Sequence, residues 1–186
     1  MKSPTLIGTV TAFLIIFSSQ QASSDESSQG GKETETILNL QKEVLTLQRQ
    51  IDFLISPIKS RLDLENYLAN NLVENTPLGR LPTAEREIFI NSLVFSERGL
   101  AGFNFGVLEY GPTATEVFNI LKLFGAQSLI SNIENMHVAS DEDMPIISQG
   151  TLNQLFVDYK DYVCISRATC KKATDHICTD NCYRPE

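Results

Sequence analysis

The side chains with the most versatile chemistry lie near the end of the chain, where all the cysteines are found. They are Cys164, Cys170, Cys178 and Cys182. In a secreted chain an even number of cysteines indicates disulfides, and a set of this size allows three pairings. Cys178 and Cys182 are one helical turn apart, so the pairing Cys164–Cys182 with Cys170–Cys178 could staple two helices or turns together. Each disulfide should contribute about 2–4 kcal/mol to this tail, which is poor in large apolar residues.

A zinc site is the alternative use of these cysteines. Sulfurs of Cys170, Cys178 and Cys182 and the imidazole of His176 could surround a zinc ion. However, their spacing is irregular, and an exported chain meets oxidants that convert thiols to disulfides. The acidic run 141–143 likewise lacks the glycine turn and spaced ligands of a calcium loop, and is interpreted as a solvated loop. The sequence therefore predicts disulfides, no metal site and no cofactor.

Groups for catalysis are sparse. The two histidines are His137, at a predicted helix end, and His176, and neither accompanies a serine elbow or a phosphate-binding glycine loop. Glycoside hydrolysis needs only carboxylates, and the candidates are Glu97, at a predicted helix end, and Glu109, in a glycine-bracketed loop. Isolated glutamates are usually solvated. The sequence therefore favours a protein that is not an enzyme, with a small secreted glycan hydrolase as the alternative.

The first residues have the organisation of a secretory signal peptide. Lys2 precedes an apolar run, residues 6–17, and the small residues 22–24 offer a cleavage site before Asp25. The apolar run is short for a bilayer span, although an uncleaved anchor is the alternative. We therefore predict a signal peptide over residues 1–24 and a secreted or periplasmic protein with no stable membrane anchor after cleavage.

The charge of the chain limits its partners further. The formal net charge is −8 and the pI is about 4.8. Binding to nucleic acid or to an anionic membrane surface relies on clustered Lys and Arg. The composition therefore excludes nucleic acid as the main partner and points to a protein partner.

A heptad pattern organises the stretch from Ile37 to Ile58. Its apolar positions, alternately a and d, are Ile37, Leu40, Val44, Leu47, Ile51, Leu54 and Ile58. β-Branched residues at a with Leu at d favour two parallel strands, so this helix is predicted to form a homodimer or to dock on a partner helix. Leu38, Leu45 and Ile55 widen the apolar face, which is typical of a helix packed within a bundle. Pairing between chains and packing within one chain both remain open.

The remaining elements are predicted to be helical, and they include helices from Thr83 through Phe95 and over residues 129–136. Thr113 and Glu116 form a capping box, and Thr151 and Gln154 form a second, each ahead of helically spaced apolar residues. The stretch 102–111 alone resembles a strand, although its glycines favour a loop or a short hairpin arm. The predicted organisation is a signal peptide (1–24), a flexible leader (25–36), a heptad helix with its continuation (37–74), an α-helical globular region (75–163) and a cysteine-rich tail (164–186). The predicted fold is thus mostly α, with a small helical bundle.

These features together predict an exported, non-enzymatic protein that acts through protein–protein contacts. Suitable roles are an accessory subunit of an envelope assembly or secretion system, or a periplasmic inhibitor or immunity protein. The glycine-rich loop offers aromatic contact residues, Phe103, Phe105 and Tyr110, because aromatic side chains are enriched at interfaces. The alternative is that these rings fill the core.

Overall fold

Residues 26–150 and 158–182 are described in the computed structural model of the protein. By its contacts the chain divides into two units, residues 1–38 and 39–186. The α-helices are α1 (Glu26–Ile55), α2 (Arg61–Asn70), α3 (Thr83–Ser92), α4 (Ala114–Lys122) and α5 (Asp143–Gly150). The strands are β1 (Val94–Ser96), β2 (Gly99–Asn104), β3 (Tyr159–Ser166) and β4 (Thr169–Cys178). Short 3₁₀ helices are η1 (Val73–Asn75), η2 (Pro77–Arg80), η3 (Gly106–Leu108), η4 (Gln127–Asn132) and η6 (Asp180–Cys182).

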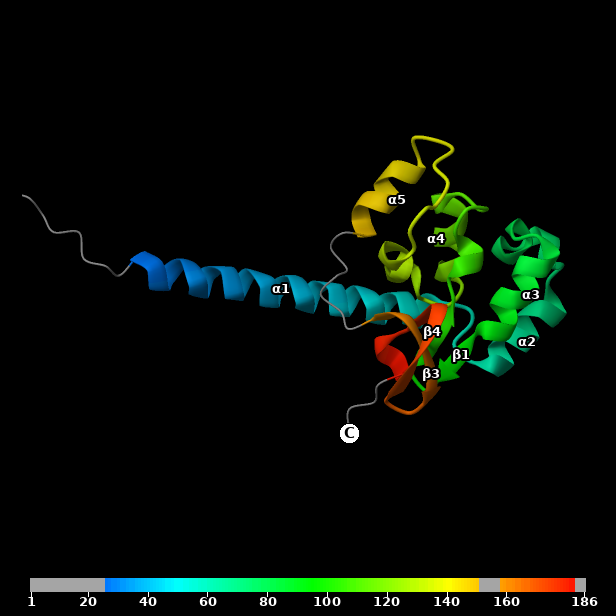
Figure 1. Ribbon diagram of the computed structural model, residues 1–186, viewed down its shortest axis with the longest axis horizontal. Coiled ribbons are helices and arrows are strands. Elements are labelled where there is room, and N and C mark those ends of the chain that lie inside the picture. Colours follow the sequence, from blue (N-terminus) through cyan, green and yellow to red (C-terminus); the bar gives the residue numbers. More distant parts are fainter. Residues whose placement is uncertain (1–25, 151–157, 183–186) are drawn as a thin grey trace, which may run out of the picture. The chain divides into compact units, whose positions relative to one another are not determined.

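The strands form one antiparallel sheet in the order β1–β2–β4–β3. β3 and β4 make a hairpin, and β4 pairs with β2 so that Ile177 lies opposite Phe103. Figure 1 shows the orange and red strands from the end of the chain beside the green strands from its middle. The prediction of a mostly α fold, with a helical bundle and a cysteine tail, is therefore wrong.

The error arises around residues 152–163, where apolar side chains have helical spacing. From Tyr159 onward the chain is a strand, and the run 162–165 is rich in the aromatic and β-branched residues that favour strands. Backbone pairing across the hairpin, for example Val163 opposite Lys171, decides the structure here. The predicted capping box at Thr151 and Gln154 lies outside the described residues.

Other predicted helices are shortened. The helix expected to continue from Thr83 through Phe95 ends at Ser92, and the chain turns from β1 into β2 at Gly99, whose φ is 107°. The helix expected around residues 129–136 is the 3₁₀ helix η4, because spacing of three and four residues does not separate α from 3₁₀ geometry. Conversely, the predicted flexible leader is helical from Glu26, since a helix that has nucleated extends at low cost per residue.

The core of the second unit lies between the sheet and the short helices. The ring of Phe89 makes edge contacts with those of Phe103 and Phe124, at centroid distances of 5.8 and 5.9 Å. α4 adds a buried face, and its predicted capping box is confirmed: Glu116 N donates to Thr113 Oγ1 at 3.2 Å and Thr113 N donates to Glu116 Oε2 at 3.0 Å. This core supports the C-terminal part of α1.

Candidate functional site on helix α1

Helix α1 has two sides that differ in how they are packed. One side, which we call the docked face, consists of Leu45, Arg49, Asp52 and Phe53, and all of these are half-buried or buried. In the heptad these residues occupy positions b, c and f. The opposite side, which we call the heptad face, consists of the a and d residues Leu40, Val44, Leu47, Ile51 and Leu54. Among the described residues, α1 therefore packs on the rest of the second unit, which we call the globular unit, through positions other than a and d.

Arg49 makes the main polar contact of the docked face. Its Nη2 donates to Asp158 Oδ2 at 2.7 Å, and its Nη1 lies 3.3 Å from Asp180 Oδ1. The side chains of Arg49 and Asp158 are only 14% and 3% exposed, so the pair is largely removed from water. Burial raises the pKa of the Asp180 carboxyl, and the Arg49 guanidinium opposes that rise. Arg49 thus connects α1 to both ends of the β3–β4 region.

Close backbone approaches fix the same face. A Cβ on Gly99 would lie 2.9 Å from the ring of Phe53, and a Cβ on Gly125 would lie 2.8 Å from the carbonyl oxygen of Asp52. Gly125 also has a φ of 65°, a conformation that glycine adopts without strain. These two glycines let α1 contact the β1–β2 turn and the end of α4 directly.

A cavity of about 390 Å³ lies beside the docked face. Asp52 and Gln48 line it from α1, and Lys122 and Gln127 line it from the other side. Asp52 is 5% exposed and accepts a hydrogen bond from Gln48 Nε2 at 2.8 Å. Burial raises the pKa of Asp52, partly offset by this hydrogen bond and by the charge of Lys122. The docked face therefore carries a carboxylate whose ionisation works against packing.

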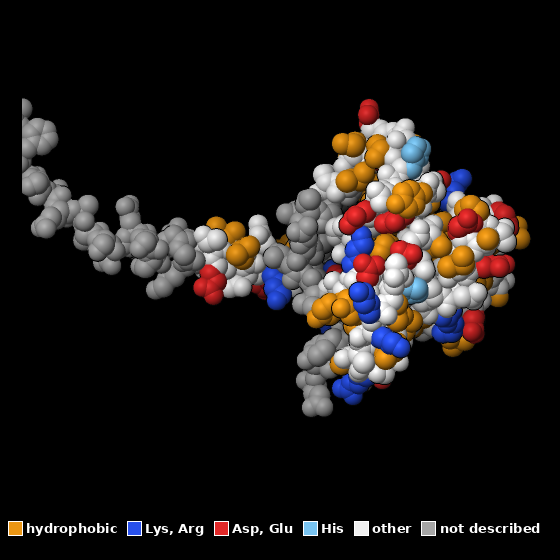
Figure 2. All heavy atoms as spheres, in the orientation of Figure 1, with side chains coloured by type: hydrophobic (Ala, Val, Ile, Leu, Met, Phe, Trp, Pro, Cys, Tyr) orange, Lys and Arg blue, Asp and Glu red, His pale blue; other side chains and the backbone are white. Residues whose placement is uncertain are grey.

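The heptad face has the opposite character, being aliphatic and open to solvent. The exposed fractions of its side chains range from 51% at Ile51 to 68% at Leu54, and Ile37 is 56% exposed. Figure 2 shows hydrophobic side chains at the surface of α1. Ile58, the last predicted heptad residue, differs from the others. Helix α1 ends at Ile55, and Ile58 is buried in the core, where its N–H donates to Leu123 O at 3.0 Å. The exposed row of a and d residues thus ends at Leu54.

The predicted aromatic contact residues are divided by the structure. Phe103 and Phe105 are 0% and 2% exposed and belong to the core, so they are not available to a partner. Tyr110 is 76% exposed, and its hydroxyl accepts a hydrogen bond from Asn135 Nδ2 at 3.1 Å. Phe103 lies in β2, whose residues 99–103 are all buried, and Phe105 follows the strand at the start of η3.

The two candidate catalytic carboxylates lie in different loops. Glu97 is exposed in the β1–β2 turn and lines two grooves, and Glu109 lines neither of them. Glu109 Oε1 instead accepts a hydrogen bond from Glu134 N at 3.2 Å. These grooves therefore do not bring Glu97 and Glu109 together as the facing pair that glycoside hydrolysis uses.

The acidic run 141–143 is only partly a solvated loop. Asp141 and Glu142 are exposed, but Asp143 is 1% exposed and accepts hydrogen bonds from the N–H and hydroxyl of Thr115 at 2.8 and 2.6 Å. These bonds, with others from the backbone of Ala139 and Ser140, lower its pKa. The bond from Thr115 N satisfies a backbone N–H in the first turn of α4, a contact between distant residues for which the local sequence gives no signal.

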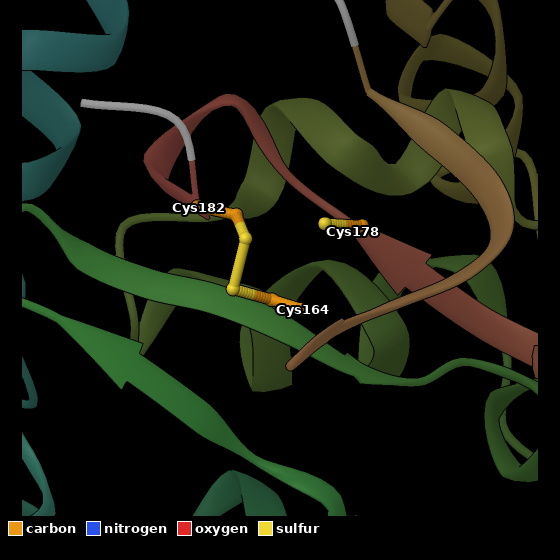
Figure 3. A group of neighbouring side chains, drawn as sticks. All are labelled: Cys164, Cys178 and Cys182. Carbon is orange, nitrogen blue, oxygen red and sulfur yellow. A yellow bond between two sulfur atoms is a disulfide. The ribbon is translucent and has the colours of Figure 1, made fainter. Parts of the chain in front are cut away.

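The cysteines form Cys164–Cys182 and Cys170–Cys178, the pairing that the spacing suggested. Disulfides indicate an oxidising, extracellular environment. The sulfurs of Cys164, Cys178 and Cys182 lie within 4.8 Å of one another, and Figure 3 shows the sulfur of Cys178 beside the Cys164–Cys182 bond. Sulfurs bonded to each other are not the thiolates that bind zinc. His176, the other proposed ligand, has its Nδ1 at 2.8 Å from Thr174 O.

Comparison with protein-family models, curated proteins and solved structures gave no match for this chain. Within residues 26–150 and 158–182, no helix has the length and hydropathy needed to cross a membrane. The site is therefore interpreted from its own geometry.

Proposed function

We propose that this chain is an exported, non-enzymatic protein that self-associates through the heptad face of α1 as a parallel, two-stranded coiled coil. The observation that carries the proposal is the contrast between the two sides of α1. The side with Arg49 and Asp52 is packed on the globular unit, while the aliphatic side remains exposed. Burying a Leu or Ile side chain contributes about 1.5–3 kcal/mol, so an exposed row of them favours a partner.

A second copy of the chain is the occupant that best fits this face. Val44 and Ile51 at a with Leu47 and Leu54 at d are the combination that favours parallel dimers. In such a dimer each g residue faces the e residue of the next heptad on the other chain. Those pairs are Thr36 with Gln41, Glu43 with Gln48, and Gln50 with Ile55. None of them brings like charges together, so identical chains meet no electrostatic opposition along the seam.

The packing of α1 on its own unit is compatible with this dimer. Positions b, c and f of a two-stranded coiled coil point away from the partner helix. Arg49 and Phe53 occupy f and c, so the globular units attach on the outer sides of the pair. The seam is thus open to a second helix while Arg49 keeps its contacts with Asp158 and Asp180.

Export is the second part of the proposal. Residues 1–24 lie outside the described residues, and their organisation is that of a secretory signal, which the two disulfides support. A secreted or periplasmic dimer could act as an accessory subunit of an envelope assembly or secretion system, or as a periplasmic inhibitor or immunity protein. In each role the dimer presents two copies of its remaining surface, which raises the effective affinity for a partner with repeated sites.

The test is the molar mass of the oxidised chain from Asp25, measured by light scattering over a dilution series. We expect the wild type to have twice the mass of one chain and Leu47→Asp to have the mass of one folded chain. Asn39→Asp is the matched control, because it adds the same charge at an exposed c position of α1 and should remain dimeric. A monomeric wild type, or a control that dissociates as readily as Leu47→Asp, would refute dimerisation through the heptad face.

A further inference from the structure

The two disulfides of the β3–β4 hairpin share one group of sulfurs. We call the Sγ atoms of Cys164, Cys178 and Cys182 the sulfur cluster, because they lie within 4.8 Å of one another. Figure 3 shows that Cys178, from the end of β4, points at the bond that joins Cys164 of β3 to Cys182 of η6. The cluster is buried against Ala101 of β2. Two separate structural disulfides do not require this proximity.

A groove gives access to the cluster from solvent. It has a volume of about 670 Å³ and is lined by both cysteines of one disulfide, Cys164 and Cys182. Its charged lining residues are Arg98, Arg167 and the acidic Glu97, so positive charge is in excess. A cationic environment favours the thiolate form of an attacking or leaving cysteine, which is the reactive form in thiol–disulfide exchange.

The hairpin register brings together a second possible pair. Cys164 and Cys170 are directly opposite each other in the β3–β4 ladder. Directly opposed residues of an antiparallel pair have Cβ atoms about 4.5–5.5 Å apart, close to the separation that a disulfide needs. Cys178 and Cys182 already belong to the sulfur cluster. The pairing Cys164–Cys170 with Cys178–Cys182 is therefore within reach of the folded hairpin.

We propose that this hairpin is a thiol–disulfide exchange centre that converts between the observed pairing and the pairing Cys164–Cys170 with Cys178–Cys182. The external reactant is a thiolate that enters the groove. It attacks Cys164 Sγ, forms a mixed disulfide with Cys164 and releases the Cys182 thiolate. That thiolate attacks Cys178 Sγ, forms Cys178–Cys182 and releases the Cys170 thiolate.

The exchange then closes within the hairpin. The Cys170 thiolate attacks Cys164 Sγ in the mixed disulfide, forms Cys164–Cys170 and releases the external thiolate. The net reaction is an isomerisation, in which no cysteine is oxidised or reduced overall and the entering thiolate is regenerated. In the observed pairing Cys182 ties η6 to β3, and Asp180 of η6 contacts Arg49 of α1. Exchange therefore moves the disulfide of η6 from β3 to β4, and η6 carries Asp180, which contacts the docked face. This inference does not depend on dimerisation.

The experiment incubates the folded wild type with a small amount of glutathione at about pH 8.5, near the ordinary thiol pKa, and then quenches it with acid. Trypsin cleaves after Arg167 and Lys171, and cleavage before Asp180 separates Cys178 from Cys182. We expect linked peptides of the observed pairing and of Cys164–Cys170 with Cys178–Cys182. Detection of the observed pairing alone would overturn the proposal. Equal appearance of Cys164–Cys178 with Cys170–Cys182 would also overturn it, because that result indicates scrambling through unfolding.

A variant separates exchange inside the cluster from attack by the added thiol. Cys170→Ser leaves a free thiol on Cys178, within 4.8 Å of the Cys164 and Cys182 sulfurs. We expect it to form Cys178–Cys182 peptides with no glutathione present. The wild type is the control, since its described cysteines are all disulfide-bonded and should keep their pairing without added thiol. A Cys170→Ser chain that stays folded and retains only Cys164–Cys182 would contradict the assignment.

Discussion

The docked face and the heptad face of α1 differ in a way that hydrophobicity alone would not suggest. The docked face contains Arg49 and Asp52, yet it is the side that packs on the globular unit. The heptad face is uniformly aliphatic, yet its side chains are more than half exposed. A monomer that only maximised apolar burial would instead pack the heptad face of α1 on the rest of the chain. Specific contacts, from Arg49 to two carboxylates and from Phe53 to Gly99, therefore set the rotation of α1.

The largest effect is expected from removing the charge contact of the docked face. Arg49→Ala leaves Asp158 buried without its cation, and such a loss costs about 3 kcal/mol in the free energy of unfolding. Lys42→Ala is the matched control, because Lys42 is also an f residue of α1 but is exposed. Urea denaturation should give a change within about 0.5 kcal/mol for the control. Equal effects of the two substitutions would mean that α1 is not held by Arg49.

Adjacent residues on opposite faces provide a sharper comparison. Phe53→Ala should lower the free energy of unfolding by about 2 kcal/mol, less than for a fully buried Phe because Phe53 is half-buried. Leu54→Ala should change it by less than about 0.5 kcal/mol, since Leu54 is 68% exposed. Both should be measured by urea denaturation in the Leu47→Asp background, which we expect to be monomeric. A larger loss for Leu54→Ala than for Phe53→Ala would reverse the assignment of the faces.

The smallest effect concerns the carboxylate on the docked face. Burial raises the pKa of Asp52 above its ordinary value of 3.8, so its contribution is fully present below that value and is lost as pH rises through the folded-state pKa. Asp52→Asn keeps an oxygen for Gln48 and removes the titration. The melting temperature of the variant should therefore rise relative to wild type between acid and neutral pH. A difference that is constant with pH would show that Asp52 ionises freely in the folded chain.

Local patterns in the sequence were reliable where the chemistry is local. The capping box at Thr113 and Glu116 formed as predicted, because its two hydrogen bonds join residues within one helical turn. The strand hairpin was missed for the opposite reason. Val163 and Tyr159 have helical spacing with the residues before them, but their strand depends on pairing with β4, and β4 depends on pairing with β2, far earlier in the chain.

The candidate site was predicted in part for a similar reason. The heptads identified the a and d row of α1, and the spacing of the cysteines suggested the observed pairing. Neither pattern predicts the docked face. That face depends on the contact of Arg49 with Asp158, which is more than one hundred positions away in the chain and is brought near only by folding. Ile58 illustrates the same limit. It continues the heptad spacing, but α1 ends at Ile55 and the Ile58 side chain is buried in the core.

Residue types at short spacing are enough to predict an aliphatic heptad row, a C-terminal segment able to form two disulfides, and a well-capped helix at Thr113. They do not predict which side of α1 is docked, that three of the cysteines lie on a strand hairpin, or that three of the sulfurs lie close together. These features depend on contacts between distant segments, such as Arg49 with Asp158 and Phe103 with Ile177.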